Sequence, residues 1–381
     1  MDVFPSVVEM RSSARNRSGL KCSPVYGTLG GMNNTDRIWI ATCLFTVSTL
    51  MAGCATAGKK VESWQRGESA VFVGEEPVRL AFVPATGQPI RVRSTYVAGV
   101  DSVEYAEGRD FVVDNSGGAL IRTSASRLPD FRENLLYGQE AFDHSKFPGF
   151  GNLKYFAFVD YVTVKPPQWP VQTDQRDRLR RVGERLRNGQ TVRMVAFGDS
   201  ITAGGDATKP EFIFWARWAD ALRQRYPLAS VEAINGATGG DTTVQGLIRL
   251  QEKVLDARPD LVLIGFGMND HNINSVTIPK FEKNLETMIA RIREATTAEI
   301  VLFSAFPPNP KWKFGSHHME DYAAATERVA KAANCAFADV FNNWQTVAAR
   351  KKPEDLLGNN INHPNDFGHW IYFRVLEAMG L

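Results

Sequence analysis

The second half of the chain alternates short apolar runs with longer amphipathic segments, and this alternation constrains the fold more than any other feature. The apolar runs have the length of buried strands, and the segments between them repeat apolar residues with a helical period. The expected strands are residues 192–197, 231–234, 261–266, 300–303 and 336–340. The expected helices are residues 212–226, 244–255, 281–295, 322–333 and 367–379. Strands that alternate with helices form βαβ units, so residues 190–381 are predicted to be an α/β domain on a parallel sheet.

Residues 60–168 carry a different pattern, in which short β-rich runs follow one another with turns, and no helical period, between them. The runs are residues 70–73, 78–83, 90–93, 111–113, 119–121, 155–159 and 161–164. Strands at such spacing favour a β-sandwich. Its aromatic residues either fill the core of the sandwich or form a platform on which sugars stack; they include Tyr96, Tyr105, Phe111, Tyr137, Phe142, Phe147 and Phe150. Residues 169–189 are predicted to be a connector helix, because Leu179, Val182 and Leu186 recur with helical spacing.

The N-terminal segment reads as a targeting sequence. Residues 38–53 are uncharged and apolar but too short to span a membrane, which takes about 20 residues. Their length and small-residue ending are typical of a signal peptide. Met51-Ala52-Gly53-Cys54 resembles the lipobox of a bacterial lipoprotein, in which Cys54 is lipidated and becomes the new N-terminus, and Ala55 after it resembles the pattern of outer-membrane lipoproteins. We therefore expect residues 1–59 to be an upstream and signal segment, with translation starting at Met32 or with an unusually long leader.

Composition excludes some classes of partner and site. Hydrophobic residues make up 44% and charged residues 23% of the 381 residues, which is ordinary for a globular protein. The net charge is only +2 and no long basic run occurs, so the sequence gives no reason to expect a nucleic-acid partner. The four cysteines have neither metal-ligand spacing nor the pattern of a disulfide framework: Cys22, Cys43, Cys54 and Cys335.

Glycine-rich and polar motifs follow three of the expected strands, and a histidine motif lies near the C-terminus. They are Gly198-Asp199-Ser200, the segment from Asn235 to Thr243, Gly267-Met268-Asn269-Asp270, and Asn362-His363-Pro364. The carboxyl ends of parallel strands share one edge of a sheet, which is where such folds bind ligands. A serine hydroxyl becomes a good nucleophile when a base accepts its proton, and histidine does this near neutral pH. Backbone N–H groups and an amide side chain can hold the resulting oxyanion, so the set predicts nucleophilic acyl transfer.

These four motifs resemble the signature blocks of the SGNH (GDSL-type) hydrolase family. The resemblance implies that Ser200 is the nucleophile and His363 the base. It also implies an oxyanion hole made of the backbone N–H groups of Ser200 and Gly240 and the side-chain amide of Asn269. A three-layer α/β/α fold and the hydrolysis of esters or thioesters, without metal or cofactor, follow from the same resemblance.

One position departs from the family pattern, which has aspartate three residues before the histidine where this chain has Asn360. Three interpretations follow. Asn360 accepts a hydrogen bond from His363 and orients its ring, as in Cys-His-Asn enzymes; a nearby carboxylate, Asp355 or Asp366, takes this role; or the site is inactive. Asp366 also stands where the last helix needs an N-cap, and Asp199 is expected to support the nucleophile.

The sequence thus predicts an exported, lipid-anchored serine ester hydrolase that forms an acyl-enzyme on small-molecule or polysaccharide esters. Acetyl esters of carbohydrate are implied by the resemblance, because family members that carry a β-sandwich are often carbohydrate esterases. Two alternatives stay open: a lipase, lysophospholipase or thioesterase acting on acyl lipids, and a glycan-binding envelope protein with an inactive hydrolase domain. The loop of residues 306–318 either lines the substrate cleft or is an ordinary surface loop.

Overall fold

The computed structural model describes residues 63–163, 169–171 and 173–381, which belong to one compact unit, Gly58–Leu381. The predicted signal segment, with Met32, residues 38–53 and the lipidation site Cys54, lies outside the described residues. In the part that is described, no helix combines the length and apolar character that crossing a membrane requires.

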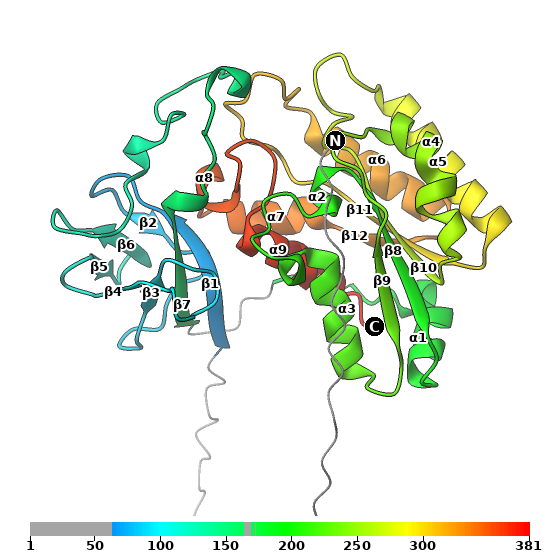
Figure 1. The fold of residues 1–381 in the computed structure, drawn as a ribbon, viewed down its shortest axis with the longest axis horizontal. Coiled ribbons are helices and arrows are strands. Elements are labelled where there is room, and N and C mark those ends of the chain that lie inside the picture. The colour runs from blue at the N-terminus through cyan, green and yellow to red at the C-terminus, as the bar shows by residue number, and fades with distance from the viewer. Residues whose placement is uncertain (1–62, 164–168, 172) are drawn as a thin grey trace, which may run out of the picture. The chain divides into compact units, whose positions relative to one another are not determined.

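A five-stranded parallel sheet forms the centre of the C-terminal region (Figure 1). Its strands lie in the order β12-β11-β10-β8-β9. They are β8 (Val192–Gly198), β9 (Val231–Asn235), β10 (Leu261–Gly265), β11 (Glu299–Phe303) and β12 (Ala336–Ala338). All four neighbouring pairs are parallel, so the predicted parallel sheet is confirmed.

Helices cover both faces of this sheet, which makes the region a three-layer α/β/α structure. The helices α4, α5 and α6 lie on one face, and α3 and α9 lie on the other (Figure 1). The helices are α1 (Arg180–Arg187), α2 (Ser200–Ala203), α3 (Phe214–Arg225), α4 (Thr243–Lys253), α5 (Ile278–Ala295), α6 (Met319–Ala332), α7 (Val340–Ala348), α8 (Pro353–Leu356) and α9 (Asp366–Glu377). Because both faces are covered, the central strand β10 is buried on both sides and reads as a continuous apolar run.

The connector helix was predicted correctly in its buried face but not in its length. Leu179, Val182 and Leu186 are all fully buried, as their spacing predicts. The helix α1 is shorter than the predicted segment because residues 176–178 form a 3₁₀ turn ahead of it. It packs against β8 and is therefore part of the α/β layers.

Two antiparallel sheets precede this region and support the predicted β-sandwich. One sheet has the order β1-β7-β3-β4 and the other the order β2-β6-β5. The strands are β1 (Ser63–Val71), β2 (Val78–Arg79), β3 (Arg91–Arg93), β4 (Glu104–Tyr105), β5 (Phe111–Asp114), β6 (Ala119–Arg122) and β7 (Phe156–Thr163). One hydrophobic cluster draws residues from both sheets, including Phe72, Leu80, Phe111, Leu120 and Val159. The two runs predicted as closing strands are one strand, β7, and the predicted boundary at residue 168 falls outside the described residues.

The antiparallel region and the α/β region share a buried polar contact. The ammonium of Lys351 lies 3.0 Å from Glu68 Oε1 and 3.7 Å from Asp355 Oδ2, and the Lys351 and Glu68 side chains are 0% exposed. The hydroxyl of Tyr161 donates to the other oxygen of Glu68 over 2.6 Å. Arg350 donates to the backbone carbonyls of Leu80 and Gly117. Side chains from the two regions are thus joined where water is excluded.

Candidate active site

Ser200 stands at the carboxyl edge of the parallel sheet because β8 ends two residues before it. A Cβ added to Gly198 would lie 2.2 Å from the carbonyl oxygen of Gly265 on β10, so the turn into α2 requires glycine here. The side chain of Asp199 caps α2 by accepting the N–H of Ile201 over 3.0 Å. Ser200 is the first residue of this helix, so its own N–H has no partner within the helix.

His363 lies in the loop between α8 and α9, and this loop is fixed by its own hydrogen bonds. The side-chain oxygen of Asn359 accepts the N–H groups of Ile361, Asn362 and His363 over 2.9 to 3.0 Å. The imidazole Nε2 lies 2.9 Å from Ser200 Oγ, so the serine hydroxyl can donate its proton to the ring. The structure therefore brings the two residues predicted as nucleophile and base into hydrogen-bonding contact.

Asp206 is the partner of His363 on the other side of the ring, and sequence reasoning missed it. Its Oδ2 lies 3.1 Å from His363 Nδ1, which identifies Nδ1–H as the donor and leaves Nε2 free to accept from Ser200. Both side chains are about one-quarter exposed, at 25% for His363 and 24% for Asp206. Serine, histidine and aspartate thus form one chain of hydrogen bonds, which is the arrangement of a catalytic triad.

The expectation that Asn360 orients His363 is wrong, since Asp206 occupies Nδ1 of the ring. Asn360 adopts a positive φ of 63°, and its side-chain oxygen accepts from Asn152 over 2.8 Å. Its carbonyl accepts from the side chain of Asn309. Asn360 therefore organises the loop rather than the imidazole.

Neither alternative carboxylate reaches the ring nitrogen. Asp355 accepts the backbone N–H of Val71 and that of Lys352, and so joins α8 to β1. Asp366 accepts both the backbone N–H and the hydroxyl of Thr208. The cap of α9 is Asn365, whose side chain accepts the N–H of Gly368, so the expected N-cap role of Asp366 is also corrected.

The loop after α2 carries Asp206 back to the histidine. Gly204 has a φ of 103° and Asp206 a φ of 58°, so the chain turns sharply at both positions. A Cβ on Gly205 would lie 2.8 Å from His363 Nδ1, so glycine lets the imidazole sit directly against the loop. The signal in the sequence is this Gly204-Gly205-Asp206 turn six residues after the nucleophile, whereas our reasoning considered only acids close to His363.

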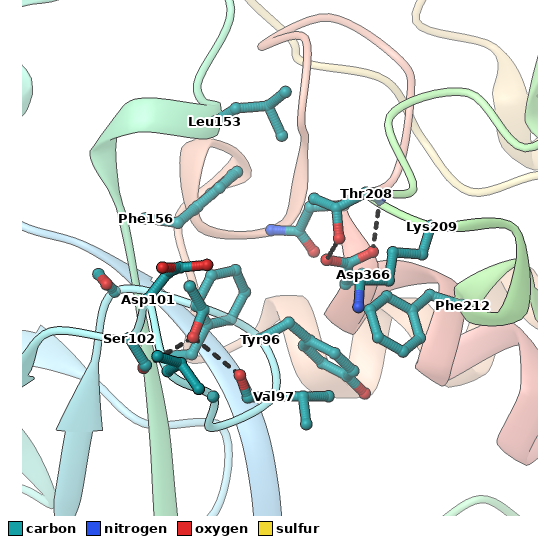
Figure 2. Close-up of a pocket in the computed structure, with 16 residues that line it drawn as sticks. Tyr96, Val97, Asp101, Ser102, Leu153, Phe156, Thr208, Lys209, Phe212 and Asp366 are labelled. Carbon is teal, nitrogen blue, oxygen red and sulfur yellow. Dashed lines mark hydrogen bonds between the residues drawn. The ribbon is translucent and has the colours of Figure 1, made fainter.

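Two residues of α9 hold this loop on either side of Asp206. The hydrogen bonds from Thr208 to the Asp366 carboxylate are visible in Figure 2. His369 is fully buried and donates Nε2–H to the carbonyl of Gly205 over 3.1 Å. Burial lowers the pKa of His369 to about 3, so this ring is neutral and acts as a fixed donor.

The predicted oxyanion donors lie on loops that meet beside Ser200. A Cβ built on Gly239 would lie 3.8 Å from Ser200 Cβ, which places the Gly239–Gly240 turn against the nucleophile. Gly240 has a φ of 79°, a conformation that favours glycine. The amide of Asn269 donates one N–H to the carbonyl of Asp241 over 2.9 Å, so it lies next to this turn and keeps a second N–H for a ligand.

Buried carboxyl groups hold these loops together. Asp270 accepts from the backbone N–H of Thr243 over 2.9 Å and from that of Gly267 over 3.2 Å, and so ties the start of α4 to the loop after β10. Burial raises the pKa of Asp270 to about 6 and that of Asp199 to about 7. In residues 63–163, 169–171 and 173–381, no three His, Cys, Asp or Glu side chains gather as a metal site would require.

Cavities open between the antiparallel region and the α/β region, and two of them are lined by loops of interest here. The first has a volume of about 330 Å³, and Thr208 and Lys209 of the Asp206 loop line it opposite Tyr96 and Phe156 (Figure 2). The second, of about 460 Å³, is lined in part by residues 309–311, so the loop of residues 306–318 faces a cavity. That loop is also held by the antiparallel region, because the N–H of Phe142 donates to the carbonyl of Lys311.

The expected aromatic residues divide between core and surface. Phe111 and Phe142 are buried, as the core interpretation expects, whereas Tyr137 is 43% exposed. Tyr96 lies edge-on to Phe212, and the guanidinium of Arg217 lies over its ring. The prediction of a sugar-stacking platform stays a prediction.

Parts of this chain are similar to known proteins. Residues 196–371 match the family model of the GDSL-like lipase/acylhydrolase family. An arylesterase of Vibrio mimicus is 30% identical over 136 residues, which cover 35% of this chain and 66% of the relative. An acetylxylan esterase of Geobacillus stearothermophilus is 22% identical over 208 residues, covering 50% of this chain and 94% of the relative. A crystal structure of a two-domain esterase active on acetylated mannans matches over 54% of each chain, with 23% identity and a TM-score of 0.45.

The matches cover only part of the length of these relatives. This chain spans 66% of the length of the Vibrio mimicus relative and 54% of the two-domain esterase. The matched segment nevertheless includes Ser200, Asp206, Gly240, Asn269 and His363. Residues 196–371 therefore form a domain that matches the GDSL-like lipase/acylhydrolase family.

Proposed function

We propose that this protein is a serine ester hydrolase that works through a covalent acyl-enzyme and removes O-acetyl groups from carbohydrate. The observation that carries the proposal is the imidazole of His363, which bridges Ser200 Oγ at 2.9 Å and Asp206 Oδ2 at 3.1 Å. A neutral imidazole between a hydroxyl and a carboxylate can take the hydroxyl proton, and the carboxylate then stabilises the imidazolium.

The reaction follows from these contacts. Ser200 Oγ attacks the ester carbonyl while His363 Nε2 accepts its proton, and Asp206 holds the ring at Nδ1. The backbone N–H groups of Ser200 and Gly240 and the amide of Asn269 donate to the oxyanion. The tetrahedral intermediate collapses as His363 returns the proton to the leaving alcohol. Water, activated by the same histidine, then hydrolyses the acyl-enzyme and releases the acid.

Acetylated carbohydrate is the substrate class that the relatives favour. The acetylxylan esterase of Geobacillus stearothermophilus aligns over 94% of its length, so nearly all of it has a counterpart in this chain. The reacting histidine is also 25% exposed, which suits an ester on the surface of a polymer. An acyl lipid would instead need an apolar channel for its chain.

The cell envelope is the proposed location. The apolar segment and the lipobox-like Met51-Ala52-Gly53-Cys54 support export and a lipid anchor at Cys54. Mass spectrometry of the mature protein tests this. We expect an N-terminal peptide that begins at a lipidated Cys54, and a peptide from residues 1–31 in the mature protein would contradict it.

Labelling and an acyl-length series test the activity. We expect the protein to react with a fluorophosphonate probe at Ser200 and to hydrolyse p-nitrophenyl acetate faster than longer p-nitrophenyl esters. Ser200→Ala should lose labelling and lower turnover on the order of 10³-fold or more. Activity that rises with acyl length would instead support a lipase or thioesterase. Polysaccharide binding without labelling would support an inactive, glycan-binding protein.

A further inference from the structure

We infer that the antiparallel region helps to position the His363–Asp206 pair of the active site, and that it does so through Asn152. This inference rests on the proposed function. Asn152 lies just before the 3₁₀ turn Leu153–Tyr155, more than 200 residues before His363 in the chain, and is 0% exposed.

Asn152 holds the His363 loop with both its side chain and its backbone. Its amide Nδ2 lies 2.8 Å from the side-chain oxygen of Asn360 and 3.0 Å from the carbonyl of Leu357. A third acceptor, the carbonyl of Glu354, lies 3.2 Å away. The backbone N–H of Asn152 donates to the carbonyl of Gly358 over 2.7 Å. One buried residue of the antiparallel region therefore contacts the loop at three points and α8 at a fourth.

Gly358 connects this hold to the pair that does the chemistry. Its N–H donates to the carbonyl of His363 over 2.9 Å, while its own carbonyl is held by Asn152. A Cβ built on Gly358 would lie 2.3 Å from the Cβ of Asp206, so the Asp206 side chain packs directly against the backbone of Gly358. A displacement of Gly358 consequently changes the place of His363 and the space available to Asp206 at once.

A network of uncharged amides keeps Asn152 in this orientation. The side chain of Asn134 donates to Asn152 Oδ1 over 3.1 Å and also to the carbonyls of Phe150 and Gly151. Buried amides need partners for every donor and acceptor, and this network supplies them without a charge. It also explains asparagine at position 360, because the amide nitrogen of Asn360 faces Asn134 Oδ1 at 3.5 Å, where an aspartate would place a second, charged oxygen.

The size of the effect follows from how strictly acyl transfer depends on geometry. A misplacement of about 1 Å by a change away from the chemistry can cost about 10²-fold in rate. Asn152→Ala removes the three side-chain contacts and leaves the backbone contact. We therefore expect kcat to fall about 10- to 100-fold while KM stays within about two-fold, because no contact with substrate is lost.

The experiment compares Asn152→Ala with a matched control, Arg350→Gln. Arg350 also crosses between the two regions, to the carbonyls of Leu80 and Gly117, but it does not contact the His363 loop. Both variants are assayed with p-nitrophenyl acetate across pH, and their free energies of unfolding are measured. In Asn152→Ala kcat should fall at every pH while KM is kept, because a looser Asp206 contact orients the imidazole less well. Arg350→Gln should lower stability alone and keep kcat.

A double-mutant comparison separates positioning from a general loss of order. If Asn152 acts through Asp206, then Asn152→Ala should cost much less in an Asp206→Asn background than in the wild type. Full additivity, or a folded Asn152→Ala protein with wild-type kcat across pH, would overturn the inference. If Asn152→Ala does not fold, Asn134→Ala removes the support of Asn152 and should give a smaller loss in the same direction; an unchanged kcat there would equally overturn it.

A measurement that needs no substrate separates the test of this inference from the test of the proposed function. The imidazole Nδ1–H shared with Asp206 should give a low-field proton NMR signal in the wild type and in Arg350→Gln, and lose it in Asn152→Ala. If the wild type neither labels nor turns over, the proposed function fails while this signal still decides the positioning. Retention of the signal in Asn152→Ala would contradict the inference whether or not the protein is an esterase.

Discussion

After His363, we expect Asp206 to be the residue on which the proposed chemistry of Ser200 depends most. Asp206→Asn keeps the size of the side chain but removes the charge that stabilises the imidazolium and changes the tautomer that the ring prefers. We expect kcat for p-nitrophenyl acetate to fall on the order of 10³- to 10⁴-fold. Asn360→Asp serves as the comparison: it should destabilise the protein without raising kcat. A near-normal kcat in Asp206→Asn would mean that another group stabilises the His363 imidazolium.

Asp199 should make stability depend on pH. Burial raises the pKa of its carboxyl from 3.8 to about 7, so the folded protein binds this proton more tightly than the unfolded chain. Its contribution to stability is full below pH 3.8 and is lost as pH rises through about 7. Asp199→Asn keeps the cap of α2 and removes the titration, so the variant should gain stability relative to the wild type between pH 5 and pH 8. Urea unfolding of both proteins at pH 5 and pH 8 measures the difference in their free energies of unfolding. The same difference at both pH values would contradict this expectation.

At the level of single residues, the sequence predicted the groups that sit in fixed motifs. Ser200, Gly240, Asn269 and His363 could be proposed because each follows a strand end or precedes a helix in a recognisable pattern, and their roles stay a prediction. Asp206 was missed because its role depends on Gly204 and Gly205 folding the chain back, which is a property of three-dimensional packing. Asn360 was misassigned because its amide is satisfied by residues of the other region, far away in the sequence.

The loop after α2 works as an element because it packs against His363 without a side chain in between. Gly205→Ala would place a Cβ 2.8 Å from His363 Nδ1 and 3.0 Å from the carbonyl of Ser200, so either the loop or the ring must move. We expect kcat to fall at least 10-fold, since this displacement acts directly on the reacting ring. Gly99→Ala is the control, because a Cβ there meets no atom within 4 Å. Steady-state kinetics of both variants measure this effect. An equal loss of kcat in Gly205→Ala and Gly99→Ala would contradict the expectation.

Elements were predictable where burial leaves a clear period. The strands of the parallel sheet were all predicted, and the signal is clearest for β10, which is buried on both faces and reads as an uninterrupted apolar run. The helix α7 was missed because only one residue, its N-cap Asp339, separates it from β12. The expected strand, residues 336–340, therefore ran into the first residue of the helix. The short strand β4 has two residues, which is too few to show an alternation.

For the whole molecule, the buried contact between Lys351 and Glu68 should make the two regions unfold together. Lys351→Met leaves the Glu68 carboxylate buried without its cation, which costs about 3–5 kcal/mol of the free energy of unfolding. The control is Lys352→Met, whose partner Glu76 belongs to an exposed ion pair between the same regions. Exposed pairs contribute about 0–1 kcal/mol. Chemical denaturation of both variants measures the difference, and similar losses would argue against a structural role for the buried pair.

The position of Asp206 has a consequence for how such a site can be transplanted or rearranged. Five residues separate the nucleophile, at the start of α2, from the acid, in the loop after α2, so one short segment carries both in any loop graft or circular permutation that cuts elsewhere. Only the histidine has to be delivered from a distant part of the chain. A design that moves this segment therefore carries both Ser200 and Asp206 with it. Only the position of the histidine relative to them then has to be built anew.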